Sequence, residues 1–169
     1  MLKNIIKGLV TLFFLTLTTY IKASHVPGGN ISYENVGPNT FVITLTVFED
    51  CGTAFISNAS EPISVSNDCG IPFQSTIQLP NVVFQDEVSQ LCVTSLPLSE
   101  CNGGSLPGVY MHVWQDTITL PGTCDSWTFA YDDCCRNSSN NLTGTGNNYY
   151  WETVCLLYTS DAADDLLCV

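Results

Sequence analysis

The stretch Phe41-Val-Ile-Thr-Leu-Thr-Val-Phe48 has the alternation of a half-buried β-strand. Every second residue of the stretch is apolar, and these residues share one face of the expected strand: Phe41, Ile43, Leu45 and Val47. The threonines at positions 44 and 46 fall on the opposite face. The stretch therefore predicts a strand with one face on a hydrophobic core and the other toward solvent.

Further stretches predict strands of the same kind. Residues 109–114 and 117–120 are separated by Gln115-Asp116, which we expect to form a bulge or a turn. Residues 126–131 align three aromatic side chains on one side of a strand: Trp127, Phe129 and Tyr131. Weaker strand signals lie at residues 31–33, 63–65, 76–79, 87–93 and 148–153. Helix signals are nearly absent.

Glycine and proline turns separate the expected strands. They stand at Pro27-Gly28-Gly29, Gly37-Pro38-Asn39, Asn102-Gly103-Gly104, Pro107-Gly108 and Pro121-Gly122. Short strands with such turns predict an all-β fold, an antiparallel, immunoglobulin-like β-sandwich, over residues 24–153. The order of the strands within the sheets does not follow from one sequence.

Residues 1–23 have the features of a secretory signal. Lys3 and Lys7 give a positive start, residues 8–21 are apolar with interspersed threonines, and Ala23 is the small residue of an imperfect cleavage site. The alternative is a membrane anchor, but this apolar run is shorter than the roughly 20 residues that a spanning helix needs. We therefore expect a protein that is secreted or lies on the outer cell surface and meets the membrane only through export.

Removal of the signal leaves a strongly acidic chain. Three of the four basic residues lie within the signal, so that Arg136 remains against sixteen Asp and Glu residues. Such a surface repels phosphate backbones and excludes nucleic acid as a partner. The surplus of carboxylates fits a solvated surface or loose binding of a divalent cation such as calcium. No other cofactor is expected.

The last residues differ in character from the stretch before them. Residues 155–164 can be encoded by TGT CTC TTA TAC ACA TCT GAC GCT GCC GAC, which resembles a transposon-end sequencing adapter read in frame. The codons for Cys168-Val169 can continue the same adapter after a variable index. We therefore expect residues 154–169 to be adapter read-through rather than native protein, and the natural chain to continue with other residues beyond Thr153.

Nine cysteines in an exported chain predict disulfides. Without the two in the tail, the candidates are Cys51, Cys69, Cys92, Cys101, Cys124, Cys134 and Cys135. A zinc site is disfavoured, because no C-x-x-C pair occurs among them. The connectivity stays open, but closure of local loops favours three bridges: Cys51–Cys69, Cys92–Cys101, and Cys124 with Cys134 or Cys135. The odd cysteine fits a partner in sequence that is missing here, or a free thiol.

No set of residues predicts a catalytic site, and we expect a protein that is not an enzyme. His25 and His112 could act as bases for a cysteine nucleophile, but no spacing links either histidine to one cysteine. The acidic pairs Glu49-Asp50, Asp86-Glu87 and Asp132-Asp133 could serve in glycoside hydrolysis or bind calcium. Adjacent residues of a strand point to opposite faces, so these acids are expected in solvated turns instead.

Two groups of residues could act at the surface. N-glycosylation sequons stand at Asn30, Asn58, Asn137 and Asn141. Aromatic residues that could form a platform for a sugar or a peptide are Trp127, Tyr149, Tyr150 and Trp151. Aromatic side chains of strands more often belong to a core, so we expect these to pack inside the domain.

Several motifs of the exported part form one set. They are Ala23-Ser-His-Val-Pro-Gly-Gly-Asn-Ile-Ser-Tyr33, Val47-Phe-Glu-Asp-Cys-Gly52, Cys101-Asn-Gly-Gly104, Pro107-Gly-Val-Tyr110, Thr117-Ile-Thr-Leu-Pro-Gly-Thr-Cys124, Trp127 and Cys134-Cys-Arg-Asn-Ser138 with Asn141-Leu142. This set resembles the amino-terminal region of large Bacteroidota surface proteins. Such proteins often carry PKD-type or other immunoglobulin-like repeats and end in a gliding-motility-associated, type IX secretion domain.

The resemblance covers most of residues 23–153 and brings no catalytic motif. It implies a non-catalytic module of an exported, adhesin-like surface protein with a binding or structural role. The implied partners are an extracellular glycan, another protein, or neighbouring repeats of the same chain. The alternative is an accessory domain of a secreted hydrolase whose catalytic domain lies outside this sequence.

Overall fold

Strands make up nearly all of the regular structure in the computed structural model, which describes residues 26–52, 56–124, 126–134 and 148–155. The strands are β1 (Gly28–Gly37), β2 (Thr40–Asp50), β3 (Glu61–Asn67), β4 (Thr76–Leu79), β5 (Asn81–Glu87), β6 (Val109–Thr119), β7 (Trp127–Cys134) and β8 (Asn148–Cys155). Two short 3₁₀ helices lie in one loop: η1 (Leu96–Leu98) and η2 (Glu100–Asn102).

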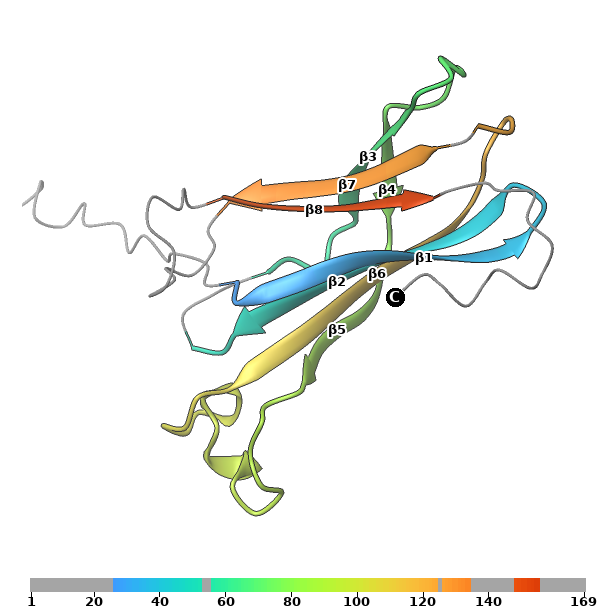
Figure 1. Ribbon diagram of the computed structural model, residues 1–169. Coiled ribbons are helices and arrows are strands. Elements are labelled where there is room, and N and C mark those ends of the chain that lie inside the picture. The colour runs from blue at the N-terminus through green and yellow to red at the C-terminus, as the bar shows by residue number, and fades with distance from the viewer. Residues whose placement is uncertain (1–25, 53–55, 125, 135–147, 156–169) are drawn as a thin grey trace, which may run out of the picture.

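The strands form two four-stranded antiparallel sheets (Figure 1). One sheet has the order β1-β2-β6-β5 and the other has the order β4-β3-β7-β8. When the strands are lettered along the chain from A to G, with β4 as C′, these orders become A-B-E-D and C′-C-F-G. This is the strand order of the immunoglobulin fold. The predicted immunoglobulin-like β-sandwich is therefore confirmed.

The alternation that predicted β2 also positions the core. Buried and half-buried residues alternate along β2 without interruption. Phe41 lies opposite Ile118 of β6, and Leu45 lies opposite Trp114, so that the buried residues of both strands share one inner face. The second sheet adds its own buried side chains to this core: Ile63, Val65, Leu79, Trp127, Phe129 and Tyr131.

Two strand predictions differ from the structure. β6 is a single strand that keeps its register with β2 from Val109 to Thr119, so the bulge or turn expected at Gln115-Asp116 was wrong. Gln115 is fixed in the ladder, because its side-chain amide donates a hydrogen bond of 2.9 Å to the hydroxyl of Thr44. The strand expected over residues 87–93 was also wrong beyond Glu87, where β5 ends and a loop begins.

Of the four aromatic residues considered for a surface platform, the two whose side chains the structure describes, Trp127 and Trp151, pack in or against the core, as expected. Trp127 is fully buried, with the edge of Phe73 at 5.7 Å between ring centroids. Trp151 is half-buried and stacks on Tyr131 at 5.9 Å. Tyr149 and Tyr150 belong to β8, and their side chains lie outside the described part of the structure.

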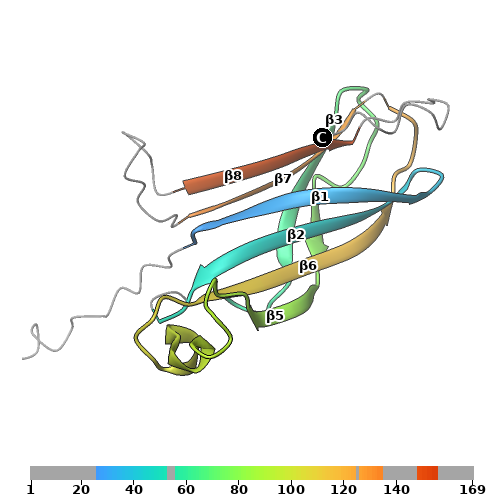
Figure 2. The ribbon, with the colours of Figure 1, turned by 60° about the horizontal axis from the view of Figure 1, so that its bottom comes forward.

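One side of the sandwich is closed where the edge strands β1 and β8 run side by side (Figure 2). Gly29 of β1 makes this approach sterically feasible, since a Cβ atom at that position would lie 2.5 Å from Cη2 of Trp151. A close approach of this kind is a common reason for glycine inside a strand. The tryptophan of one sheet thus packs against the backbone of the other.

The disulfides differ from the predicted pairs. Cys51 is bonded to Cys101, with their Cα atoms 4.9 Å apart, and Cys69 is bonded to Cys124 at 5.9 Å. The local pairs Cys51–Cys69 and Cys92–Cys101, and a bridge from Cys124 to Cys134 or Cys135, were therefore wrong. Strand pairing is the physical reason. Asn67 lies opposite Trp127 in the β3–β7 ladder, which brings the residues just beyond these two strand ends together.

Candidate functional site

One end of the sandwich, which we call the loop end, gathers long connections on a rigid frame (Figures 1 and 2). β2 and β5 end there at Asp50 and Glu87, and β6 begins there at Val109. The connection from β2 to β3 spans residues 51–60, and the connection from β5 to β6 spans residues 88–108. β7 ends and β8 begins at the same end. The immunoglobulin letters for these connections are B–C, D–E and F–G.

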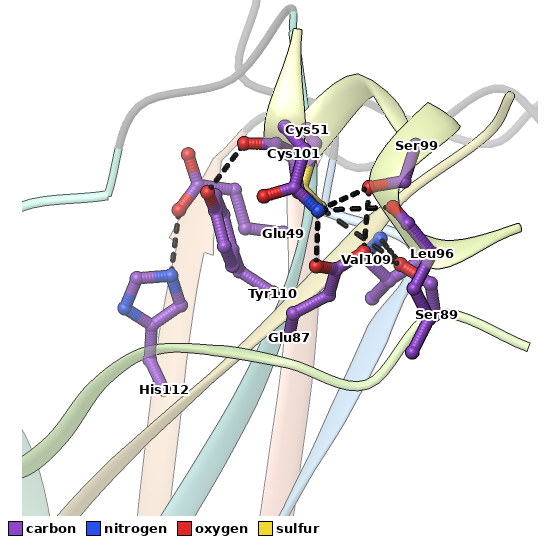
Figure 3. Close-up of a disulfide and its surroundings, with 11 residues drawn as sticks. Glu49, Cys51, Glu87, Ser89, Leu96, Ser99, Cys101, Val109, Tyr110 and His112 are labelled. Atoms are coloured by element: carbon purple, nitrogen blue, oxygen red, sulfur yellow. Dashed lines mark hydrogen bonds and ion pairs between the residues drawn. A yellow bond between two sulfur atoms is a disulfide. The ribbon is translucent and has the colours of Figure 1, made fainter. Parts of the chain in front are cut away.

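The β5–β6 connection, called the long loop below, is held by a hub of hydrogen bonds on Glu87 (Figure 3). One carboxylate oxygen accepts the hydroxyls of Ser89 at 2.9 Å and Ser99 at 2.6 Å, and the other accepts the side-chain amide of Asn102 at 2.8 Å. These donors lie at the start and in the middle of the loop. Loops of this length in compact domains are usually functional, and this one is ordered by its own polar contacts.

The same hydrogen bonds set the charge of the hub. They hold the pKa of the Glu87 carboxyl below its ordinary value, with the bond from Ser99 as the largest cause and the bond from Ser89 next. Glu87 is therefore ionised at neutral pH. Its negative charge strengthens each of these bonds relative to a neutral acceptor.

The disulfide Cys51–Cys101 ties the long loop to the end of β2 (Figure 3). The backbone N–H of Cys51 donates to the carbonyl of Gly108 at 3.0 Å, and the Tyr110 hydroxyl donates to the carbonyl of Cys101 at 3.0 Å. Gly108 is buried against the bridge, since a Cβ atom there would lie 2.6 Å from Sγ of Cys101. The β2–β3 and β5–β6 connections are thereby fixed to each other.

A buried pair of ionisable residues lies just inside the loop end. Nε2 of His112 and Oε2 of Glu49 are 2.6 Å apart, and both side chains are buried. Burial lowers the pKa of His112, while the hydrogen bond and the charge of Glu49 act in the opposite direction. Trp114 stacks on the imidazole at 5.8 Å, and Phe84 covers it edge-on at 5.1 Å. Nδ1 of His112 has no hydrogen-bond partner among the described residues.

The position of Glu49 differs from one expectation and agrees with another. The expectation that it lies in a solvated turn was wrong, because it continues the inward-facing series of β2 beyond Val47. Asp50, the next residue, is half-buried on the opposite face, as the alternation of a strand requires. The two acids therefore do not share a site.

A shallow pocket opens on the outer face of the β1-β2-β6-β5 sheet at the loop end. Its volume is about 340 Å³, and its lining is mostly apolar. The lining residues are Pro27, Gly28, Phe48, Val88, Gln90 and Val109. The first residues of the long loop form one wall, and the ends of β1, β2 and β6 form the rest. The pocket joins the sheet face to the loop.

The remaining predicted site residues have the following places. Cys92 is an exposed free thiol in the long loop, next to Val93, which is 82% exposed. Cys134 ends β7, and its side chain, like Cys135, lies outside the described residues, as do His25, Asn137 and Asn141. The sequon residues Asn30 and Asn58 are exposed. Within the described ranges, no three His, Cys, Asp or Glu side chains come together as metal ligands do.

Sequence reasoning did not find the Glu87 hub. No periodic pattern marks Ser89, Ser99 and Asn102, because the residues of a loop follow neither the two-residue period of a strand nor the 3.6-residue period of a helix. The usable signal was the length of the segment between the strand signals on either side, together with the polar residues at Ser99 and Asn102. Only the hydrogen bonds of the folded loop identify Glu87 as their common acceptor.

Comparison of the chain with protein-family models, with curated proteins and with solved structures gives no match. The two disulfides indicate a non-reducing environment for the folded domain. In the described part of the chain, no helix has the length and apolar character needed to cross a membrane.

Proposed function

We propose that this domain is a non-catalytic binding module of an exported, adhesin-like bacterial surface protein and that it binds its partner through the loop end. The observation that carries the proposal is the long loop itself. It stands at one end of a rigid sandwich and is fixed by a disulfide and by the Glu87 hub. Binding sites are commonly built on loops that a rigid scaffold positions.

The bracing of the loop favours affinity. A binding loop that must first become ordered spends part of its interaction energy on lost conformational freedom. The Cys51–Cys101 bridge and the bonds to Glu87 order the long loop before any partner arrives. Antibody variable domains use the B–C and F–G connections of the same end of this fold, although a shared fold alone does not imply a shared function.

The direction of the strands supports the same assignment. β1 and β8 both begin at the loop end, and β8 ends at the opposite end with Cys155, which lies opposite Trp127. In a longer surface protein with further repeats, the chain after β8 would leave from that opposite end. The loop end would then face away from the rest of the protein, where a partner can reach it.

The non-catalytic part of the proposal is supported by the state of the reactive groups. Cys51, Cys69, Cys101 and Cys124 are oxidised, and a disulfide sulfur is not a nucleophile, so that Cys92 is the one free thiol among the cysteine side chains that the structure describes. The imidazole of His112 is buried beneath Phe84 and bonded to Glu49, so a substrate would have to displace that packing to reach it.

A polymer block tests the use of the loop end. The exported chain, with Cys134, Cys135, Cys155 and Cys168 replaced by serine and its two described disulfides formed, is labelled at Cys92 with a bulky maleimide-polymer, and its binding to a panel of polysaccharides and immobilised extracellular proteins is measured. The matched control carries Cys92→Ser and Asn39→Cys, which moves the polymer to the β1–β2 turn at the other end. We expect the label at position 92 to abolish binding and the label at position 39 to leave it intact.

The reverse pattern would contradict the proposal, and so would an absence of binding to every member of the panel. A catalytic domain encoded directly downstream of residue 153 would favour the alternative, an accessory domain of a secreted hydrolase. Sequencing of the natural gene beyond that point distinguishes the two.

A further inference from the structure

We propose that Asn102 is a modification site: its side chain loses ammonia when the Glu87 hub opens, and the carboxylate that results prevents the long loop from closing again. The reaction needs no partner other than water. The inference does not depend on the binding function proposed above, and its failure would leave that function untouched.

The sequence at Asn102 supplies the reacting groups. Gly103 follows it, and this is the one Asn-Gly pair of the chain. In such a pair the backbone nitrogen of the glycine, once it has lost its proton to solvent, attacks Cγ of the asparagine. A C–N bond forms, ammonia leaves from Cγ, and a five-membered succinimide ring results. Water then opens the ring to aspartate or isoaspartate. Glycine hinders this attack least, because it has no Cβ atom beside the nitrogen.

Solvent reaches the pair in the folded domain. Asn102 and Gly103 are both exposed, and a Cβ atom built on Gly103 would have no neighbour within 4 Å. Water can therefore enter and ammonia can leave. The hydrogen bonds of the two reacting groups, rather than access to solvent, decide whether the reaction occurs.

The closed loop engages both reacting groups. The side-chain amide of Asn102, which must leave, donates to Oε2 of Glu87 at 2.8 Å and to the hydroxyl of Ser99 at 3.1 Å. It also donates to the carbonyl of Leu96 at 3.0 Å. The backbone N–H of Gly103, which must lose its proton, donates to the first carbonyl of η2 at 3.1 Å. Attack requires these bonds to break, so the closed hub slows the reaction and an open loop permits it.

The product does not fit the hub. A carboxylate at position 102 donates no hydrogen bond, so the three acceptors of the asparagine amide lose their donor. One of its oxygens would take the place of Nδ2, which lies 2.8 Å from an oxygen of the ionised Glu87 carboxylate. Two negative charges at that distance repel each other. The modification therefore converts a transient opening of the loop into a lasting one.

The rate of deamidation tests the protection by the hub. The chain is prepared as for the polymer block, except that Cys92 is capped by alkylation so that no thiol exchanges with the two bridges. It is incubated at neutral pH, and mass spectrometry follows the peptide that contains Asn102. We expect Glu87→Gln, which replaces a charged acceptor with a neutral one, to speed deamidation about three- to tenfold. Glu100→Gln, an exposed acid of the same loop, is the matched control and should leave the rate unchanged.

Equal rates in Glu87→Gln and the unchanged chain would overturn the inference. Melting curves show whether the variants are folded. The unchanged chain in urea gives the rate without any hub. A folded chain that deamidates at Asn102 within about twofold of this rate would also overturn the inference, whether or not Glu87→Gln folds.

A variant that imitates the product tests the lasting opening. Hydrogen exchange is measured at the amides of Ser105 and Leu106, which both donate to the carbonyl of Leu98 in the closed loop. Asn102→Ala removes the donor without adding a charge, and Asn102→Asp does both. We expect protection to be about two- to fivefold lower in Asn102→Asp than in Asn102→Ala.

A double variant reverses the hydrogen bond between the two positions. In Glu87→Gln/Asn102→Asp the new amide can donate to the new carboxylate, so protection should rise above that of Asn102→Asp alone. Protection in Asn102→Asp equal to that of the unchanged chain would show that the loop closes over the product, and would overturn the inference. Protection equal to that of Asn102→Ala would overturn the part played by charge.

Discussion

At the scale of single residues, Glu49 and His112 form a buried pair of ionisable groups. Taking two ionisable groups out of water is costly, and their mutual hydrogen bond of 2.6 Å offsets that cost only while both are present. Each residue is also packed in a core, where Trp114 and Phe84 enclose the imidazole. Removal of one partner should therefore be worse than replacement of both.

The first prediction follows from this asymmetry. His112→Ala leaves the Glu49 carboxylate buried without its donor and should lower the free energy of unfolding by about 3–5 kcal/mol. The double variant Glu49→Leu/His112→Phe replaces the pair with apolar side chains and should recover most of that loss. Urea unfolding measures both. A loss below about 1 kcal/mol in the single variant would show that water reaches Glu49 and that the pair is not truly desolvated.

At the scale of elements, the long loop depends on one ionised side chain. The folded-state pKa of Glu87 lies below its ordinary value, so folding of the loop favours the ionised form. This contribution is fully present above the unfolded-state pKa, about 4.3, and is lost as the pH falls through the lower folded-state pKa. The loop should therefore loosen in acid before the sheets do.

Hydrogen exchange checks this second prediction at the amides bonded within the loop. Asn102 donates to Ser99, and Ser105 donates to Leu98. After correction for intrinsic exchange, their protection should fall below about pH 4. In Glu87→Gln it should already be lower at pH 7 and change little with acid. Glu100→Gln, an exposed acid of the same loop, serves as the control and should behave as the unchanged protein does.

The strands could be predicted from the sequence, but the contacts between them could not. Alternation predicted β2 and β7 because one face of each strand packs on the core. The same alternation, continued one step beyond Val47, places Glu49 inside, but its partner His112 becomes visible only through the register of β2 with β6. The Glu87 hub could not be predicted, because its donors come together only when the long loop closes on itself.

At the scale of the whole molecule, each disulfide braces one end of the sandwich. Cys51–Cys101 holds the loop end, and Cys69–Cys124 holds the opposite end beside the β3–β7 ladder. The pairing could not be derived from spacing, because local loop closure is only one contribution and the strand order decides which loops meet. The bonded cysteines are 50 and 55 residues apart in the sequence.

The third prediction compares the two bridges. In the chain-entropy account, loops of 50 and 55 residues correspond to a stabilisation of about 4 kcal/mol each. Cys51→Ser/Cys101→Ser and Cys69→Ser/Cys124→Ser should therefore lower the free energy of unfolding to a similar extent. Limited proteolysis should separate them, since only the first double variant should be cut readily in the long loop. If the first double variant resisted the protease as well as the second does, the Glu87 hub would suffice to hold the loop without the Cys51–Cys101 bridge.

The overlap of the two bridges has a mechanical consequence. Cys69 lies within the segment closed by Cys51–Cys101, and Cys101 lies within the segment closed by Cys69–Cys124. Tension applied between the start of β1 and the end of β8 acts along the length of the domain, because the two strands start at the same end and run in the same direction. Once the sheets shear apart, the chain between Cys51 and Cys124 cannot straighten along its full contour. It becomes taut along residues 51–69 and the second bridge, so the loop that this bridge closes, whose ends are 55 residues apart in the sequence, would add no length to the domain under load.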